Sequence, residues 1–413
     1  MAAAGDPMQA QQWGLARVGA PAAWATSVGR GIVVAIVDTG IDLGHQDLPA
    51  SRLVVLPGSN LVTPGQPPQD DHGHGTHVAG IVGAETGNGV GVAGVAPEAR
   101  LMPVKVLDSS GRARGTTVED GIRFAADHGA RVINISIGAA LVQPITGPGF
   151  ESAIEYAWSK GAVPVVAAGN SYNGGVLGSG YSPNTHAIVV TATDKNDALA
   201  TYASGSNGAR WGMAAPGGAD PNFNPPQDEI LSTYWVAGKT NQYAYDAGTS
   251  MAAPHVAGAI ADLLALGLTP QQAVDRVLAT AKKGLSASLG AGRLDVAAAV
   301  AGLGGSGTHF STSGAPVPGG RPKPSSGAGG SVSSSAAAAA SSTALPGQPS
   351  VATANGGGGA ASGSNTPDKN ARSSATTRPR HTPRWPIVLL AVALLVTAAG
   401  LAARRATAHR LRE

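Results

Sequence analysis

The chain has 413 residues, a formal net charge of +3 and no cysteine. The missing cysteine excludes disulfide bonds, thiol catalysis and thiolate metal sites. Because several arginines crowd into the C-terminal end and the remaining charge is nearly balanced, we expect no nucleic-acid binding. The composition changes sharply near residue 303, which predicts one folded domain followed by a tail of different character.

Short apolar runs rich in β-branched residues predict buried strands in the first 300 residues. They span residues 31–38, 99–107, 130–138, 162–170 and 187–193. Helical patterns occupy residues 116–129, 149–161, 251–267 and 269–281, and Thr116 and Glu119 have the spacing of a capping box. This alternation predicts an α/β domain with a mainly parallel, twisted sheet and helices on both faces. In such a domain the functional site is expected at the carboxyl ends of the strands.

Three separate segments each contribute one member of a nucleophilic relay. Asp38 ends the first predicted strand, His74 is flanked by glycines, and Ser250 follows Gly248 and Thr249 just before a predicted helix. A serine hydroxyl attacks an amide at neutral pH only with a base in hydrogen-bond reach and an acid that orients this base. The three residue types supply these roles.

The motifs DTG, HGTHVAG and GTSMAAPHVAG carry these residues in the order Asp, His, Ser, and they resemble the signature blocks of the subtilisin family. The resemblance runs from about residue 11 to residue 301. It implies a subtilisin-like three-layer domain and a serine endopeptidase that hydrolyses polypeptides through an acyl-enzyme. It also implies that Asn170, which ends the motif VVAAGN, stabilises the oxyanion together with the backbone N–H of Ser250.

The same resemblance implies a substrate-binding edge. Ser136, Ile137 and Gly138 would pair with the extended substrate backbone before the cleaved bond, as an added strand does. Gly111 and Gly115 fit the opposite side of that cleft.

The pocket for the substrate side chain before the cleaved bond is expected beside Ala167, Ala168 and Gly169, which are small. Its depth and preference depend on the loops around residues 176–183. The sequence alone therefore predicts a polypeptide substrate without its side-chain preference.

Asp47 and the glycine-rich loop 86–94 resemble the family's calcium site. Asn88 and the backbone carbonyls near Thr86, Val90 and Val92 would supply further oxygen ligands, which suit calcium. A plain turn explains the glycines equally well, so calcium is expected only as a structural ion, with no cofactor required for the reaction.

The expected organisation is an N-terminal extension (1–10), the peptidase domain (11–303), a Gly/Ser/Ala/Pro-rich linker (304–384), a transmembrane helix (385–403) and a short basic tail (404–413). The linker has too few large apolar residues to compensate for the entropy of ordering. Residues 387–403 carry no charge and span about 26 Å as a helix, near the roughly 30 Å of a bilayer core. A buried core helix is the alternative. We expect a single-pass protein of the cell membrane with an external catalytic domain.

A subtilisin-like domain with such a spacer and one C-terminal span is similar to the mycosins, proteases attached to type VII secretion systems. The resemblance implies secretion components as partners. Mycosins usually carry disulfides, however, and this chain has no cysteine.

Two rival hypotheses belong to other classes. His72, His74 and His77 have a spacing that could supply three imidazoles to zinc in a metallo-hydrolase, but Thr76 stands where the metallo-β-lactamase pattern has an aspartate. A non-catalytic scaffold could keep the fold without activity, but all four catalytic positions are intact.

Overall fold

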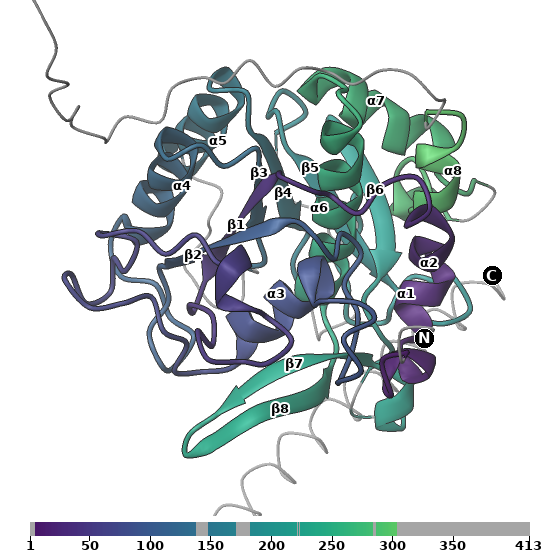
Figure 1. Ribbon diagram of the computed structural model, residues 1–413. Coiled ribbons are helices and arrows are strands. Elements are labelled where there is room, and N and C mark those ends of the chain that lie inside the picture. Colours follow the sequence, from purple (N-terminus) through teal and green to yellow (C-terminus); the bar gives the residue numbers. More distant parts are fainter. Residues whose placement is uncertain are drawn as a thin grey trace, which may run out of the picture. The chain divides into compact units, whose positions relative to one another are not determined.

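In the part of the chain that the structure describes, six strands form a wholly parallel sheet in the order β2-β1-β3-β4-β5-β6 (Figure 1). This computed structural model describes residues 5–137, 148–170, 182–220, 222, 224–283 and 286–303. The strands are β1 Val33–Asp38, β2 Arg100–Lys105, β3 Val132–Ile135, β4 Val163–Ala167, β5 Ile188–Thr193 and β6 Trp211–Pro216. The first five confirm the strands predicted from the sequence, with shorter bounds, and β6 was not predicted.

Helices cover both faces of this sheet, which confirms the predicted α/β architecture of the domain. On one face lie α4 (Thr117–Asp127) and α5 (Pro148–Ser159), and on the other lie α3 (His74–Gly83) and α6 (Thr249–Ala265) (Figure 1). Side chains alternate along β1: Val34 and Ile36 belong to the core under α6, while Ala35 and Val37 belong to the core under α4. Burial on both faces explains why β1 is apolar along its whole length.

Shorter elements complete the domain. They are η1 Gln9–Gln11, α1 Trp13–Arg17, α2 Ala20–Ala23, η2 Ala50–Arg52, η3 Pro226–Asp228, α7 Pro270–Thr280, η4 Ala287–Leu289 and α8 Val296–Val300. The capping box predicted for α4 is wrong, because the Thr116 hydroxyl donates to Asp120 Oδ2 at 2.7 Å instead of accepting from the helix backbone. A capping box does occur at α7, between Thr269 and Gln272.

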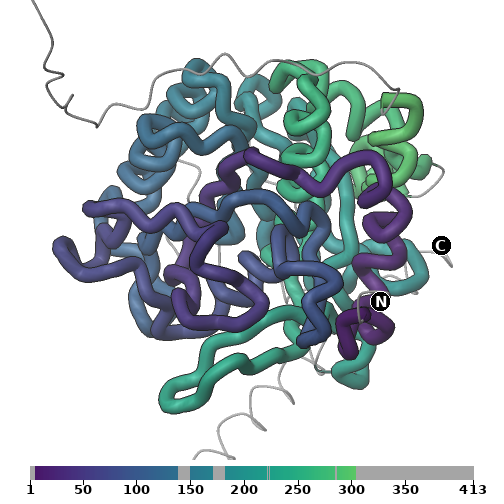
Figure 2. The backbone as a smooth tube through the Cα atoms, in the orientation of Figure 1, coloured from purple at the N-terminus to yellow at the C-terminus, as the bar shows by residue number. Residues whose placement is uncertain are grey.

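An antiparallel hairpin of β7 (Ile230–Val236) and β8 (Lys239–Asp246) precedes α6 and was not predicted. Figure 2 shows its tip extending away from the sheet. Its base is fixed to α3, because Ser232 Oγ donates to the His77 carbonyl and Thr233 Oγ1 to the Thr76 carbonyl, both at 2.7 Å. The hairpin therefore connects the helix of His74 with the helix of Ser250.

The predicted linker, transmembrane helix and basic tail lie outside the described residues, as do the first four residues of the N-terminal extension. No helix within the described ranges has both the length and the apolar character needed to cross a bilayer. The division at residue 303 stays a prediction.

Candidate active site

Asp38 occupies the carboxyl end of β1, at the position where the sheet order reverses. The next strand in the chain, β2, lies on one side of β1, and β3 lies on the other. Loops leaving β1 and β3 in opposite directions open a crevice at such a point, and ligands of open α/β sheets bind there. The topology thus places Asp38 where a functional carboxylate is expected.

The carboxylate of Asp38 contacts the imidazole of His74. His74 Nδ1 lies 2.8 Å from Asp38 Oδ1, which also accepts from the Thr39 N–H at 2.7 Å. Asp38 is fully buried, and its Oδ2 has no hydrogen-bond partner among the residues that the structure describes. A buried carboxylate at Nδ1 favours the tautomer with the proton on Nδ1, which leaves Nε2 free to act as a base.

His74 begins α3, and the close packing of this helix against β1 depends on glycine. A Cβ at Gly75 would overlap the Gly40 carbonyl oxygen and would lie 3.2 Å from the Asp38 Cβ. The Gly75 N–H donates to Thr39 Oγ1 at 2.9 Å. Glycine at this position therefore lets the imidazole come within hydrogen-bond distance of Asp38.

Asp70, which sequence reasoning missed, organises the start of α3. Its Oδ1 accepts from the N–H groups of His72 and Gly73 and from Thr39 Oγ1, and its Oδ2 accepts from the N–H and hydroxyl of Thr76. A buried carboxylate satisfies the free N–H groups of a first helical turn and is favoured by the helix dipole. Asp70 thus links residues before and after His74 to Thr39, which directly follows β1, and so holds the start of α3 against the end of this strand.

The pKa of His74 reflects this surrounding negative charge. Burial lowers it, but the charge of Asp38, the Asp38 hydrogen bond and the charges of Asp246 and Asp70 together raise the pKa of His74 to about 9. Two other histidines in the same region behave in the opposite way. Burial lowers the pKa of His77 and lowers that of His255 to about 4. Of these three imidazoles, only His74 is set up to hold a proton readily.

Ser250 is the second residue of α6 and is buried. Its hydroxyl donates to the Ser136 carbonyl oxygen at 3.0 Å. Among the described residues, no hydrogen bond joins Ser250 to His74. The first turn of a helix favours negative charge on this side chain and on a nearby oxyanion.

Asn170 lies beside the start of α6 with its amide held in one orientation. Its Oδ1 accepts from the Thr249 N–H at 3.1 Å and from Thr249 Oγ1 at 3.0 Å. Thr249, also missed from the sequence, is itself fixed because its Oγ1 accepts from the Gly169 N–H at 3.1 Å. Since the oxygen is engaged, Nδ2 is left as a donor next to Gly248, where a Cβ would lie 3.2 Å from it.

The predicted substrate residues lie around these groups. Ser136 and Ile137 follow β3 and are buried, whereas Gly138 lies outside the described residues. Ala168 is 6% exposed, and Gly169 has a φ of 99°, a left-handed conformation that favours glycine.

Gly111, predicted for the opposite side of the cleft, lies near His72: a Cβ on Gly111 would lie 3.3 Å from Nε2 of this exposed histidine. Gly115 has a positive φ and open space around its Cα. Most of the loop expected around residues 176–183 lies outside the described ranges.

Residues 29–292 match the family model described as the subtilase family. The chain belongs to this family. It is a serine endopeptidase of the subtilisin type, as expected from its motifs.

Similar proteins agree with this assignment. The chain is 42% identical to thermitase from Thermoactinomyces vulgaris over 261 residues, which cover 63% of this chain and 84% of that protein. It is 40% identical to subtilisin Savinase from Lederbergia lenta over 255 residues, covering 61% and 84%. A protease structure from Pseudoalteromonas arctica PAMC 21717 superposes with a TM-score of 0.63 at 32% identity, over 73% of this chain and 99% of that one.

In this subtilase, Asp47 and Asn88 meet on the loop predicted to bind calcium. Asn88 Nδ2 donates to Asp47 Oδ1 at 2.8 Å, and Asp47 Oδ2 accepts from the Val92 N–H and the Tyr243 hydroxyl. Asp6, missed from the sequence, accepts from the N–H groups of Gly87 and Asn88 on the same loop. Two carboxylates and one amide thus converge there, and burial raises the pKa of Asp47 despite its hydrogen bonds.

The zinc hypothesis finds no support in this geometry. His77 Nε2 lies 3.0 Å from the Ile230 carbonyl and 3.1 Å from the Ala244 carbonyl, while His72 is exposed. Across the described part of the chain, no three His, Cys, Asp or Glu side chains form a group that could hold a metal ion.

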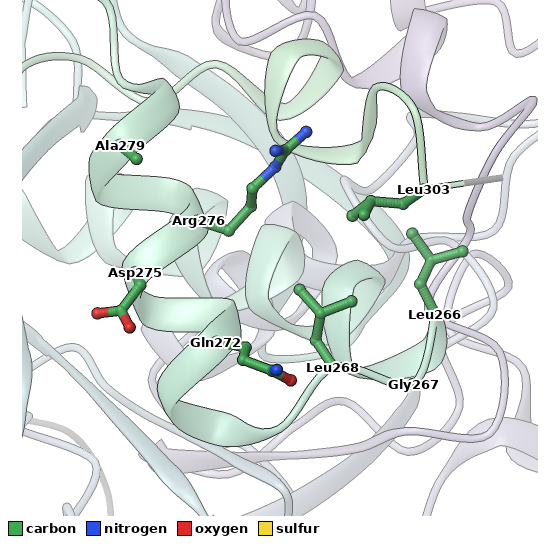
Figure 3. Close-up of a pocket in the computed structure, with 8 residues that line it drawn as sticks. All are labelled: Leu266, Gly267, Leu268, Gln272, Asp275, Arg276, Ala279 and Leu303. Carbon is green, nitrogen blue, oxygen red and sulfur yellow. The ribbon is translucent and has the colours of Figure 1, made fainter.

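A groove of about 550 Å³ lies between the end of α6 and α7 (Figure 3). Leu266, Leu268 and Leu303 point into it, and α7 lines the other side. Leu266 comes 16 residues after Ser250, about 24 Å along the helix axis. The groove is therefore separate from the peptidase site.

Proposed function

We propose that this endopeptidase cuts with Ser250 as nucleophile, His74 as general base and Asp38 as the group that orients His74. The hydrogen bond of 2.8 Å between Asp38 and His74, at the carboxyl end of β1, carries this proposal. Ser250 comes from α6, which packs against α3 and therefore brings the nucleophile to the same side of the sheet.

In the first step, His74 Nε2 takes the proton of Ser250 Oγ as that oxygen bonds to the substrate carbonyl carbon. Asn170 Nδ2 and the Ser250 N–H donate to the resulting oxyanion. The protonated His74 then gives its proton to the leaving amine, which releases the first product and leaves an acyl-enzyme. Water attacks the acyl-enzyme by the same route in reverse, with His74 again as base.

The substrate is a polypeptide in extended conformation. Its backbone pairs with the edge at Ser136 and Ile137, and its side chain before the cleaved bond enters the space next to Ala168 and Gly169. Small residues at these two positions leave room for that side chain.

A fluorophosphonate probe tests the assignment. It forms a covalent bond only with an activated serine, so we expect one labelled site per chain and complete loss of labelling in Ser250→Ala. Ser27→Ala is the matched control, since it removes another buried serine hydroxyl, which contacts the Asp262 carbonyl instead of the candidate site. Equal labelling of Ser250→Ala and the wild type would refute the proposed nucleophile.

A structural calcium ion would be held by Asp47 and Asn88, with Asp6 from the N-terminal segment. Carboxylate and amide oxygens on a rigid loop suit this ion, once Asn88 turns its amide oxygen toward Asp47. Binding to the folded state alone would stabilise the domain. We expect added Ca²⁺ to raise the Tm of Ser250→Ala, a background without self-digestion, and Asp47→Asn to remove this response. An unchanged Tm at millimolar Ca²⁺ would argue against the site.

We also propose that residues 385–403 anchor the protease in the cell membrane with the catalytic domain outside, as in mycosins serving type VII secretion systems. The uncharged segment 387–403 supports the anchor. A tag after Glu413 should resist external protease in intact cells, whereas the catalytic domain should be digested. Recovery of the full-length protein in the wash of intact cells would contradict the anchor.

A further inference from the structure

Ser136 and Ser250 are joined by two hydrogen bonds that run in opposite directions. Ser136 Oγ donates to the Ser250 carbonyl oxygen at 2.8 Å, and Ser250 Oγ donates to the Ser136 carbonyl oxygen at 3.0 Å. The first bond fixes the backbone of Ser250 to the segment after β3. The second determines where the nucleophile's proton points.

Asn134 sets the direction of the first bond. Its Nδ2 donates to Ser136 Oγ at 2.9 Å. Because one lone pair of this oxygen is occupied, the Ser136 hydroxyl proton is directed toward the Ser250 carbonyl. Asn134 and Ser136 are fully buried and Ser250 is 7% exposed, so water competes weakly for these bonds.

The second bond holds the nucleophile in an unreactive orientation. A hydroxyl has one proton, and in this structure the Ser250 proton is donated to a carbonyl oxygen instead of to His74. The acceptor is the carbonyl of the segment that, in the proposed function, pairs with the substrate backbone. The substrate N–H and the Ser250 O–H therefore compete for the Ser136 carbonyl oxygen.

We propose that Ser136 is a positioning residue whose hydroxyl fixes the Ser250 backbone and whose carbonyl holds the Ser250 hydroxyl until a substrate backbone N–H replaces it. The displaced hydroxyl then turns toward His74 Nε2. No covalent bond changes in this step, and the proton stays on Ser250 until the attack. The inference rests on the proposed function and adds that binding of an extended peptide releases the Ser250 hydroxyl that then attacks this peptide.

The hydroxyl of Ser136 is tested by Ser136→Ala. This change keeps the carbonyl but removes the bond to Ser250, so we expect kcat to fall about tenfold with KM within about twofold, because a small misplacement of the nucleophile affects chemistry more than binding. Ser136→Thr, which restores a hydroxyl, should recover most of the kcat. Ser27→Ala is the matched control, since Ser27 Oγ donates at 2.9 Å to the Asp262 carbonyl on the same helix α6, far from Ser250.

The carbonyl is tested on the wild-type enzyme, so no variant has to fold. Two peptides are compared that differ only by a methyl group on the backbone nitrogen of the residue before the cleaved bond. The methylated peptide cannot donate to Ser136, and we expect its kcat to fall at least tenfold, beyond any rise in KM. Fluorophosphonate labelling of the same preparation reports the nucleophile independently.

Two results would overturn the inference while leaving the proposed function intact. One is a Ser136→Ala enzyme as active as Ser27→Ala; the other is a methylated peptide that differs only in KM. Labelling that survives Ser250→Ala would instead remove the proposed function itself.

Discussion

His74 Nδ1 lies 2.8 Å from Asp38 Oδ1, while Asp38 Oδ2 has no partner within the described part of the chain. The negative charge of this buried carboxylate is therefore shared with few donors besides the imidazole. Asp246, at the end of β8, adds a second negative charge from the hairpin side, and Asp70 adds a third from the start of α3. The pH dependence of the enzyme follows from this arrangement.

The first prediction concerns this pH dependence. Only neutral His74 can accept the serine proton, and the surrounding carboxylates raise the pKa of His74 to about 9. We expect kcat/KM to rise with pH, and the midpoint of this rise should lie above 6.5, the ordinary pKa of histidine, in the direction of 9. Asp246→Asn removes one charge that favours the imidazolium and should shift this midpoint to lower pH. Initial rates on one peptide between pH 5 and 10 measure both effects.

The exposed Asp275 on α7 provides the control for that shift. Asp275→Asn changes the net charge equally, but Asp275 is not among the groups that raise the pKa of His74. Its pH profile should match the wild type. A rate that is flat from pH 5 to 8 would contradict a general base at His74.

The second prediction concerns Asn170. Asn170→Ala removes the amide donor next to Gly248, and kcat should fall about 10²- to 10³-fold with little change in KM. This magnitude is the one known for removing an oxyanion donor from subtilisin, a member of this family. Single-turnover kinetics with a peptide substrate measures it. Because Asn170 also holds Thr249, the unfolding temperature should be recorded alongside. A loss confined to KM would assign Asn170 to binding.

The third prediction concerns Asp197, a buried carboxylate shared by three cations. It accepts a bidentate pair from Arg17 at 2.8 and 2.9 Å, lies 2.7 Å from Arg293 Nε and 3.5 Å from Lys282. Its φ is 65°, which asparagine tolerates, so Asp197→Asn changes the charge without backbone strain. This change leaves the buried Arg293 without its carboxylate partner, although Nη1 keeps its bonds to the Arg17 and Leu294 carbonyls, and the free energy of unfolding should fall by about 3–5 kcal/mol.

Urea unfolding in the Ser250→Ala background measures this loss. The control is Glu98→Gln, which breaks the exposed pair with Arg30 and should cost less than about 1 kcal/mol. If both variants lost the same small amount, the Asp197 cluster would not hold the N-terminal helices in place.

The sequence was sufficient to predict those helices and strands whose own residue pattern reflects where they are buried. β1 is β-branched and apolar because both of its faces are buried, so its position and the place of Asp38 at its end could be inferred without coordinates. Asp6 could not be found in this way, because it binds the N–H groups of Gly87 and Asn88, about 80 positions along the chain. Asp70 carried a local signal that was overlooked, since an aspartate just before a predicted helix can bind the first N–H groups that follow it.

The hairpin of β7 and β8 was missed although it carries a signal. Its strands alternate Thr, Tyr and small residues around Ala237 and Gly238, which is typical of a hairpin with a two-residue turn. All of β8 and the last three residues of β7 are not fully buried, so these strands lack the long apolar run that marked the central sheet. The orientation of the Ser250 hydroxyl likewise has no sequence signal, since it depends on a carbonyl 114 positions away.

The last prediction concerns Asp262, which lies fully buried in α6, with neither carboxylate oxygen hydrogen-bonded to a described residue. Burial raises its pKa well above 3.8. The folded state therefore holds a proton on Asp262 that the unfolded chain releases near pH 4. Between pH 4 and the folded pKa, this difference lowers stability as pH rises.

Asp262→Asn keeps the shape and removes the titration. In the Ser250→Ala background, this variant should be more stable than its parent by about 1–3 kcal/mol at pH 8, and the difference should shrink toward pH 4. Urea unfolding at several pH values measures the difference. If the variant were equally destabilised at every pH, the carboxylate would have a partner that asparagine cannot replace, and the charge of Asp262 would be part of what holds α6 in the core.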